Sequence, residues 1–256
     1  MKVARLLLFG WLLHLKMLSR SAFDGLLGVM WPLFFATTAF LMYRAGAGST
    51  TLLYASLGAS VLGVWSATAV AASSALQRER WQGTLELLVG VPVHFSLVLL
   101  PITIAMASIG VYSMAATLFW GRVLFGIEVH VEHPLLFVLS VPATVVSIGM
   151  LGFLLSVTVV RYRTAWALGN VFEYPVWLVC GFLVPLTILP DWVRPISWVL
   201  APTWGIRAIR ESALGGSPLP DVAVCLGLGC ACALTGVLLI ESVLRSARVH
   251  ASLSLS

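Results

Sequence analysis

The sequence predicts an all-α integral membrane protein with six transmembrane helices, and three observations lead to this prediction. Of the 256 residues, 60% are hydrophobic and 10% are charged, whereas an ordinary soluble domain carries about 25% charged residues. Long apolar runs such as residues 135–160 match the roughly 20 residues that one helical span needs. These runs lack the alternation of apolar and polar residues that strands of a membrane barrel require.

Short polar or charged breaks separate the six predicted spans. The spans cover residues 23–43, 52–76, 95–120, 135–160, 165–189 and 222–244. They use most of the chain, so we predict a single transmembrane domain over residues 1–256 without a separate soluble domain.

Residues 1–21 are predicted to form an amphipathic helix that lies in the membrane interface. At about 100° per residue, four cations fall on one narrow arc of this helix: Lys2, Arg5, Lys16 and Arg20. Apolar side chains, Trp11 among them, lie opposite, as expected for a helix in contact with membrane lipid. Because cations interrupt the apolar run and no small-residue cleavage site follows, a retained helix is favoured over a signal peptide.

The distribution of basic residues predicts the orientation. Ten of the fifteen Lys and Arg residues fall on the side of the membrane that holds both termini, and five fall on the other side. The positive-inside rule then places both termini in the cytoplasm. The net charge of +5 follows from this topology, and no nucleic-acid partner is predicted.

The charged break between the second and third predicted spans, residues 78–92, is the most informative segment. It reads RERWQGTLELLVGVP. A charged side chain costs about 2.5–3.5 kcal/mol at the bilayer centre, so the chain has to leave the membrane here. Thr84 can cap a short helix that has Glu86 in its first turn, and Pro92 ends it. On spacing alone, a solvated loop with Trp81 at the interface is an equally good interpretation.

This segment resembles the stretch that follows the second span in type-2 ABC exporter permeases. There, a charged E-R-x-x-G-T-x-E sequence is followed by leucine and, shortly afterwards, by proline. The matching residues are Glu79, Arg80, Gly83, Thr84, Glu86, Leu87 and Pro92. The N-terminal helix and the Pro- and Trp-rich segment 190–219 also resemble the family, so the likeness covers essentially the whole chain. Drug and antibiotic exporter permeases are the most similar subgroup.

The resemblance implies an ATP-driven exporter in the cell inner (plasma) membrane. Residues 78–92 would form a cytoplasmic coupling helix seated in a separate ATPase subunit, and residues 190–219 would form short outer helices. The implied coupling residues are Arg78, Glu79, Arg80, Trp81, Gly83, Thr84, Glu86 and Leu87. Two P-loop ATPase subunits and a second permease, identical or homologous, would be the partners.

ATP chemistry is predicted to lie on the partner and not on this chain. A P-loop needs a Gly-x-x-x-x-Gly-Lys-Ser/Thr sequence, and the only lysines, Lys2 and Lys16, lack that context. The chain is therefore predicted to be a non-catalytic subunit that binds no cofactor, with ATP and Mg bound by the ATPase.

In the family the second and fifth spans are thought to line the transport route. The implied path residues are Trp65, Thr68, Asn170, Glu173 and Tyr174. Acids inside a membrane usually face a bundle interior or a watery path. For Glu173, cargo contact, a protonatable switch and a role in helix packing all stay open. For the small polar groups of the second span, Ser66 included, helix packing is favoured.

Two other functions stay open. The first is an ion-gradient-driven secondary transporter with Glu173 as the proton carrier, although the two halves show no likeness of the kind that inverted repeats produce. The second is a non-transporting sensor or immunity subunit, which shares the ATPase partner and moves nothing. The cargo itself is not predicted.

A metal site is not favoured anywhere in the chain. The four cysteines lie inside apolar runs without a CxxC pair, so we interpret them as packing residues. Glu128, His130 and Glu132 would share one face of a strand, the arrangement that a metal site needs. A solvated outer loop is the favoured interpretation of these three residues. The outer tryptophans Trp192, Trp198 and Trp204 are interpreted as interfacial anchors, with a lid over the exit as the alternative.

Overall fold

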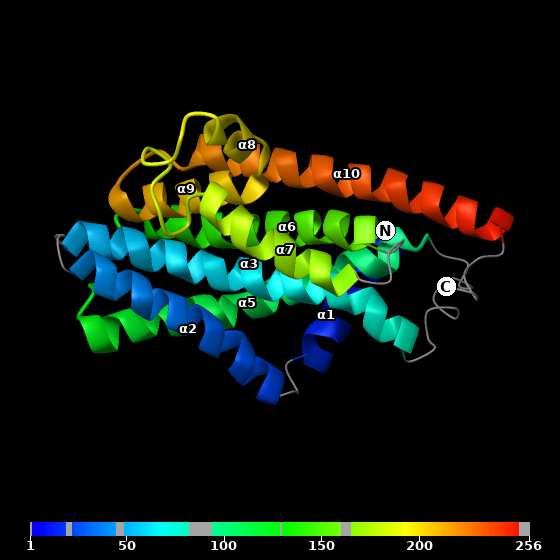
Figure 1. Cartoon of the computed structure of the whole chain (residues 1–256), viewed down its shortest axis with the longest axis horizontal. Coiled ribbons are helices and arrows are strands. Elements are labelled where there is room, and N and C mark those ends of the chain that lie inside the picture. The colour runs from blue at the N-terminus through cyan, green and yellow to red at the C-terminus, as the bar shows by residue number, and fades with distance from the viewer. Residues whose placement is uncertain are drawn as a thin grey trace.

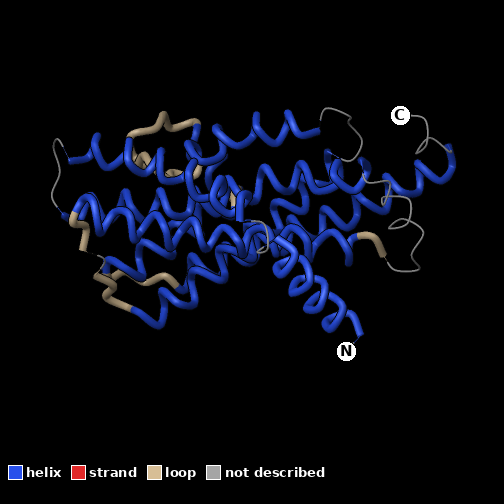
Figure 2. The backbone as a smooth tube through the Cα atoms, turned by 90° about the horizontal axis from the view of Figure 1, so that it is seen from below, coloured by secondary structure: helices blue, strands red, loops and turns tan. Residues whose placement is uncertain are grey.

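The computed structural model describes residues 2–18, 22–44, 49–81, 94–128, 130–159 and 165–250, and within these ranges the chain forms helices joined by turns and loops (Figure 2). In chain order the helices are α1 (Lys2–Leu18), α2 (Ala22–Arg44), α3 (Ser49–Trp81), α5 (Ser96–Phe125), α6 (Pro134–Val159), α7 (Ala165–Val179), α8 (Val193–Val199), α9 (Ala201–Leu214) and α10 (Leu219–His250). The predicted all-α class is confirmed.

Four of the described helices are long and apolar enough to cross a membrane. They contribute the apolar stretches 52–69 of α3, 96–125 of α5, 134–157 of α6 and 219–240 of α10. The other two predicted spans correspond to α2, which has a shorter apolar stretch over residues 32–42, and to α7. These lengths and compositions indicate a multi-pass membrane protein.

Helix α3 continues past the point where the second span was expected to end. It runs without a break to Trp81 and contains 33 residues, which corresponds to a length of about 50 Å against about 30 Å of hydrocarbon. Residues 77–81 (QRERW) contain neither Pro nor Gly, so the charges force the chain out of the lipid without ending the helix. Residues 82–93, most of the predicted coupling helix, lie outside the described residues.

Helix α7 is shorter than the predicted fifth span, and the expectation that this span reaches residue 189 is wrong. The helix ends at Val179, and Gly181 then adopts a φ of +74°, which glycine tolerates because it has no Cβ. The amide of Phe182 turns back to donate to the carbonyl of Trp177 at 3.2 Å. Pro185, a little further on, cannot continue a helical hydrogen-bond pattern.

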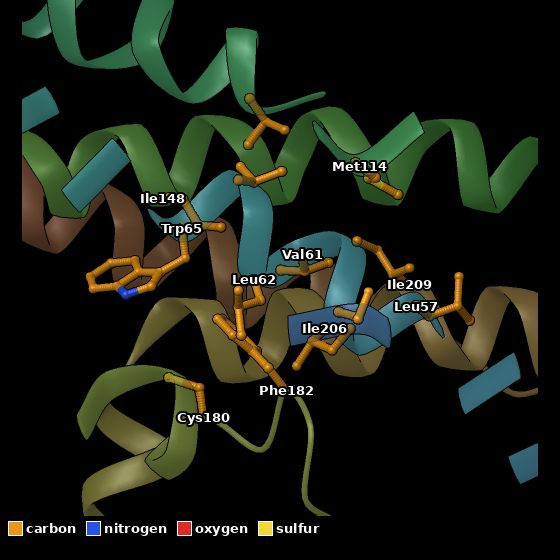
Figure 3. Close-up of a cluster of buried hydrophobic side chains, with 14 of the residues drawn as sticks. Leu57, Val61, Leu62, Trp65, Met114, Ile148, Cys180, Phe182, Ile206 and Ile209 are labelled. Atoms are coloured by element: carbon orange, nitrogen blue, oxygen red, sulfur yellow. The ribbon is translucent and has the colours of Figure 1, made fainter. Parts of the chain in front are cut away.

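Helix α3 lies at the centre of the bundle and contacts α2, α5, α6, α7 and α9. Its buried side chains form the main core with residues from α5, α6, α9 and the turn after α7 (Figure 3). The labelled members are Leu57, Val61, Leu62, Trp65, Met114, Ile148, Cys180, Phe182, Ile206 and Ile209. Close approach is possible because Gly110 of α5 faces Val64, where a Cβ would lie 2.6 Å from the Val64 Cα.

The Pro- and Trp-rich segment 190–219 contains the expected short helices, as α8 and α9, while their position on the outer side stays a prediction. Gly215, with a φ of +89°, ends α9. The amides of Glu132 and His133 donate to the carbonyls of Ala213 and Ser212, at 3.2 and 3.0 Å, and thereby satisfy carbonyls that a helix end leaves open. In Figure 1, α8 and α9 lie at one end of the bundle, and the C-terminal ends of α3 and α10 lie at the other.

Helix α1 runs obliquely to the long helices (Figure 2) and packs on α5. The indole N–H of Trp11 donates to the Ser108 hydroxyl at 3.0 Å. Arg5 and Lys16, from the predicted cationic arc, are exposed. The apolar side of the helix that carries Trp11 therefore faces the protein.

Candidate functional site

The structure joins α3 and α7 near the middle of the bundle through Glu173. The hydroxyl of Ser66 donates a hydrogen bond to Glu173 Oε1. The indole N–H of Trp65 donates to the main-chain oxygen of Glu173 at 3.2 Å. The carboxyl group is half-buried, and a hydrogen bond offsets part of the cost of removing it from water. Two neighbouring residues of α3 therefore hold the same residue of α7.

The other predicted path residues have different surroundings. Trp65 is fully buried in the core. Thr68 is also fully buried, and its hydroxyl donates to the Val64 carbonyl of its own helix at 2.7 Å. Tyr174 is 52% exposed and meets Trp177 edge to face, with 6.3 Å between ring centroids. The side chain of Asn170 lies outside the described residues. The structure thus brings together Trp65 and Glu173 and places Tyr174 on the outside.

An aromatic contact extends this junction to α2. The ring of Phe35 lies 6.0 Å from that of Trp177, centroid to centroid, at a tilt of 48°. Such pairs add about 0.5–1.5 kcal/mol beyond the burial of their surface. Helices α2, α3 and α7 therefore meet around Glu173, in the region expected to contribute to a transport route.

Sequence reasoning missed the importance of Arg210, which it counted as an outer basic residue. The structure buries Arg210 to 5% exposure. Its Nη1 donates to the Gly181 carbonyl at 2.8 Å and its Nη2 to the Phe182 carbonyl at 2.6 Å. The guanidinium carbon lies 3.4 Å from the centroid of the Tyr54 ring on α3. These three partners are main-chain oxygens and a ring, and pairing of charges along the sequence does not reveal such contacts.

A second arginine of α9 forms ion pairs at the start of α10. Arg207 Nε lies 3.3 Å from Asp221 Oδ2, and Arg207 Nη2 lies 3.8 Å from Glu211 Oε1. Burial raises the pKa of Glu211, and the Asp221 carboxylate raises it further. Arg207 opposes this effect. The cluster fastens α9 to the first turn of α10.

The loop residues considered for a metal are exposed at the surface. His130 Nε2 and Glu132 Oε1 lie 3.9 Å apart, and Glu128 is exposed nearby in the sequence. Within the described part of the chain, no three His, Cys, Asp or Glu side chains are placed to hold a metal ion. The four cysteines are free thiols.

The predicted coupling residues are only partly described. The backbone of residues 78–81 forms the last turn of α3, and nothing is described of the side chains of Arg78, Glu79, Arg80 and Trp81. Gly83, Thr84, Glu86 and Leu87 lie outside the described residues. Their assignment stays a prediction from the sequence motif.

Comparison with known proteins identifies the family. A family model described as ABC-2 type transporter matches residues 9–214, a range that extends from α1 to the end of α9. No curated protein matches the chain. The match includes α3 and α7 with the Glu173 junction, and also the Arg210 contact. This chain therefore belongs to the ABC-2 type transporter family and is a membrane permease subunit of an ABC transporter.

Proposed function

We propose that this permease is the membrane half of an ATP-driven exporter of drug-like compounds, working in the cell inner (plasma) membrane. It has six spans with both termini in the cytoplasm, and it forms a dimer with a second permease, identical or homologous. Separate P-loop ATPase subunits bind and hydrolyse ATP. The observation that carries the proposal is the family match over residues 9–214, together with a charged motif at the end of α3.

Residues 78–92 are the proposed coupling helix. Its support is the position of the motif: α3 brings residues 78–81 to the end of the bundle where α10 also ends (Figure 1). A helix about 50 Å long exceeds the hydrocarbon thickness, so its charged turn has room to lie in water. The short segment beyond it needs a partner surface to be stable, and the ATPase would provide that surface.

Helix α1 is the proposed elbow helix in contact with membrane lipid. The Trp11–Ser108 hydrogen bond ties it to α5, and the apolar side chains of Phe9, Leu13 and Met17 are exposed. Exposed apolar groups beside the cations Arg5 and Lys16 suit the boundary between headgroups and acyl chains.

Affinity purification in mild detergent tests the proposal. We expect the unaltered permease to co-purify with a P-loop ATPase and its ATP hydrolysis. Glu86→Arg reverses a charge in the coupling motif and should lower co-purified ATPase activity and ATP-driven transport at least about tenfold, the effect of breaking one charged interface contact. Glu128→Arg, on the exposed outer loop, is the matched control and should change neither.

The outcome without an ATPase is equally informative. A permease that purifies alone, or a Glu86→Arg variant that transports normally, would refute the coupling proposal. Transport that proceeds without the ATPase and stops on addition of an uncoupler would instead indicate a gradient-driven transporter. An ATPase complex that moves nothing would indicate a sensor or immunity subunit.

Glu173 is the proposed contact for cargo in the path between α3 and α7. Glu173→Gln keeps the shape and can still accept the hydrogen bond from Ser66, but it removes the charge that a membrane-embedded site would use. We expect ATP-driven uptake of an amphipathic fluorescent dye into inverted vesicles to fall about tenfold, since one lost charged interaction is worth about that factor. Glu211→Gln, in α9, should transport the dye normally. Normal dye uptake by the Glu173→Gln variant would indicate that Glu173 serves helix packing and does not contact cargo.

A further inference from the structure

Helix α7 lies at the edge of the bundle and is held mainly by one neighbour. It packs chiefly on α3, while Val171, Tyr174 and Leu178 form an exposed stripe on its other side. A helix in this position can shift without separating the remaining helices from one another.

The C-terminal end of α7 is fastened by side chains of the two short helices. Ser197 of α8 donates its hydroxyl to the Val179 carbonyl at 2.6 Å, and Arg210 of α9 binds the next carbonyls in the chain, those of Gly181 and Phe182. These oxygens belong to the group that a helix end leaves without intrahelical partners. The end of α7 is therefore closed by hydrogen bonds to α8 and α9 and not by continuation of the helix.

Arg210 also connects this end to α3. Its guanidinium lies over the Tyr54 ring, and one turn later Gly58 leaves room for the Phe182 carbonyl. The guanidinium thus has an aromatic ring over its face and two carbonyl oxygens at its edge, in a place almost free of water. Removing any one of these partners makes the buried charge less stable, so the ring and the two carbonyls together hold the guanidinium in place.

We propose that Arg210 is a latch that holds the C-terminal end of α7 against α3 and that opens during the transport cycle. The inference rests on the exporter function proposed above. When the latch opens, the end of α7 moves away from α3, and the transport route opens at the end of the bundle that carries α8 and α9. Cys180, which is 1% exposed and precedes Gly181, becomes accessible to reagents at the same time.

Labelling of Cys180 measures the latch directly. In a chain with Cys225, Cys230 and Cys232 replaced by alanine, we expect N-ethylmaleimide to label Cys180 slowly. Arg210→Met keeps an unbranched, flexible side chain but removes the charge and the hydrogen-bond donors. It should raise the labelling rate at least about tenfold, because each of the two charge-assisted hydrogen bonds that it removes represents about that factor. Arg210→Lys, which keeps the charge but loses the two-pronged geometry, should give an intermediate rate.

Two controls separate latch opening from general loosening. Arg207→Met changes a partly exposed arginine of the same helix that does not bind α7, and it should leave Cys180 labelling unchanged. In a chain that retains only Cys225, which is fully buried in α10, Arg210→Met should not raise labelling. Equal labelling of Cys180 in the Arg210 and Arg210→Met chains would refute the latch, and so would a parallel rise at Cys225.

The complex with its ATPase tests the link to transport. With Arg210 in place, trapping the complex with ATP and vanadate should change the Cys180 labelling rate about tenfold relative to the nucleotide-free state, as a shift between closed and open populations requires. If the complex transports but the labelling rate of Cys180 is the same with and without nucleotide, the latch does not open in the cycle. If no ATPase co-purifies, the exporter proposal fails, while the Arg210→Met comparison still reports on the latch.

Discussion

Replacement of Gly58 by alanine is expected to prevent the permease from accumulating in a folded form. A Cβ at this position would lie 1.6 Å from the Phe182 main-chain oxygen and 2.4 Å from Arg210 Nη2, whereas ordinary contacts begin at 3.4 Å. The nearest atom belongs to the backbone, and the Phe182 side chain is fully buried, so the neighbour has nowhere to move. Overpacking of a core costs about 1–3 kcal/mol and occasionally more, and this contact should lie at the upper end.

The matched control is Gly227→Ala in α10. A Cβ there would meet no atom within 4 Å, and alanine is the better helix former by about 1 kcal/mol. Fluorescence-detected size-exclusion chromatography and thermal unfolding in mild detergent would compare the two variants. We expect Gly227→Ala to match or exceed the unaltered protein, and Gly58→Ala to lose its monodisperse peak. A Gly58→Ala variant that melts normally would contradict a close contact between Gly58 and the Phe182 carbonyl.

Replacement of Trp65 by alanine is expected to cost about 3–5 kcal/mol of stability, as for other large buried side chains. The indole is fully buried at the centre of the core, and its N–H also holds the Glu173 carbonyl. Trp198→Ala is the control, since Trp198 is 59% exposed and surface changes usually stay within about 0.5 kcal/mol. Thermal unfolding of purified protein, read by intrinsic fluorescence or light scattering, would measure both.

A third variant separates packing from a role in the path. Trp65→Phe keeps most of the apolar volume and loses only the N–H donor, so we expect a destabilisation of about 1 kcal/mol. If Trp65 serves packing alone, transport by Trp65→Phe should follow its stability. A stable Trp65→Phe variant that no longer transports would support the role in the transport path that the sequence predicted for Trp65.

The positions of the long apolar helices were predictable because they depend on composition along short stretches. Runs of apolar residues between charges located both ends of α2 and α6 to within one residue and the starts of α5 and α10 to within three, since lipid tolerates little else. Helix ends were less predictable, because they depend on local geometry. The charges at residues 78–80 end an apolar run but not a helix, and α7 stops where Gly181 adopts a left-handed conformation.

In the candidate site, too, some residues could be predicted from the sequence and others could not. The acid Glu173 was identifiable because a carboxyl group in an apolar run is unusual anywhere in a membrane. Its partner Ser66 was not identifiable. Neighbouring residues of α3 face different helices, and the sequence does not show which of them faces Glu173. Arg210 was out of reach for another reason: its ligands are main-chain oxygens of Gly181 and Phe182, and every residue has a main-chain oxygen.

Because α3 is unbroken, its length determines the direction in which its charged C-terminal turn points. One continuous helix connects Gly58 and Trp65 with the charged turn at residues 78–81. Inserting a single residue between them would rotate that turn by about 100° about the helix axis and advance it by about 1.5 Å, while the core end stayed in place. The number of residues between the core and the charged turn therefore fixes the angle at which that turn points about the helix axis. The identity of these residues does not affect that angle.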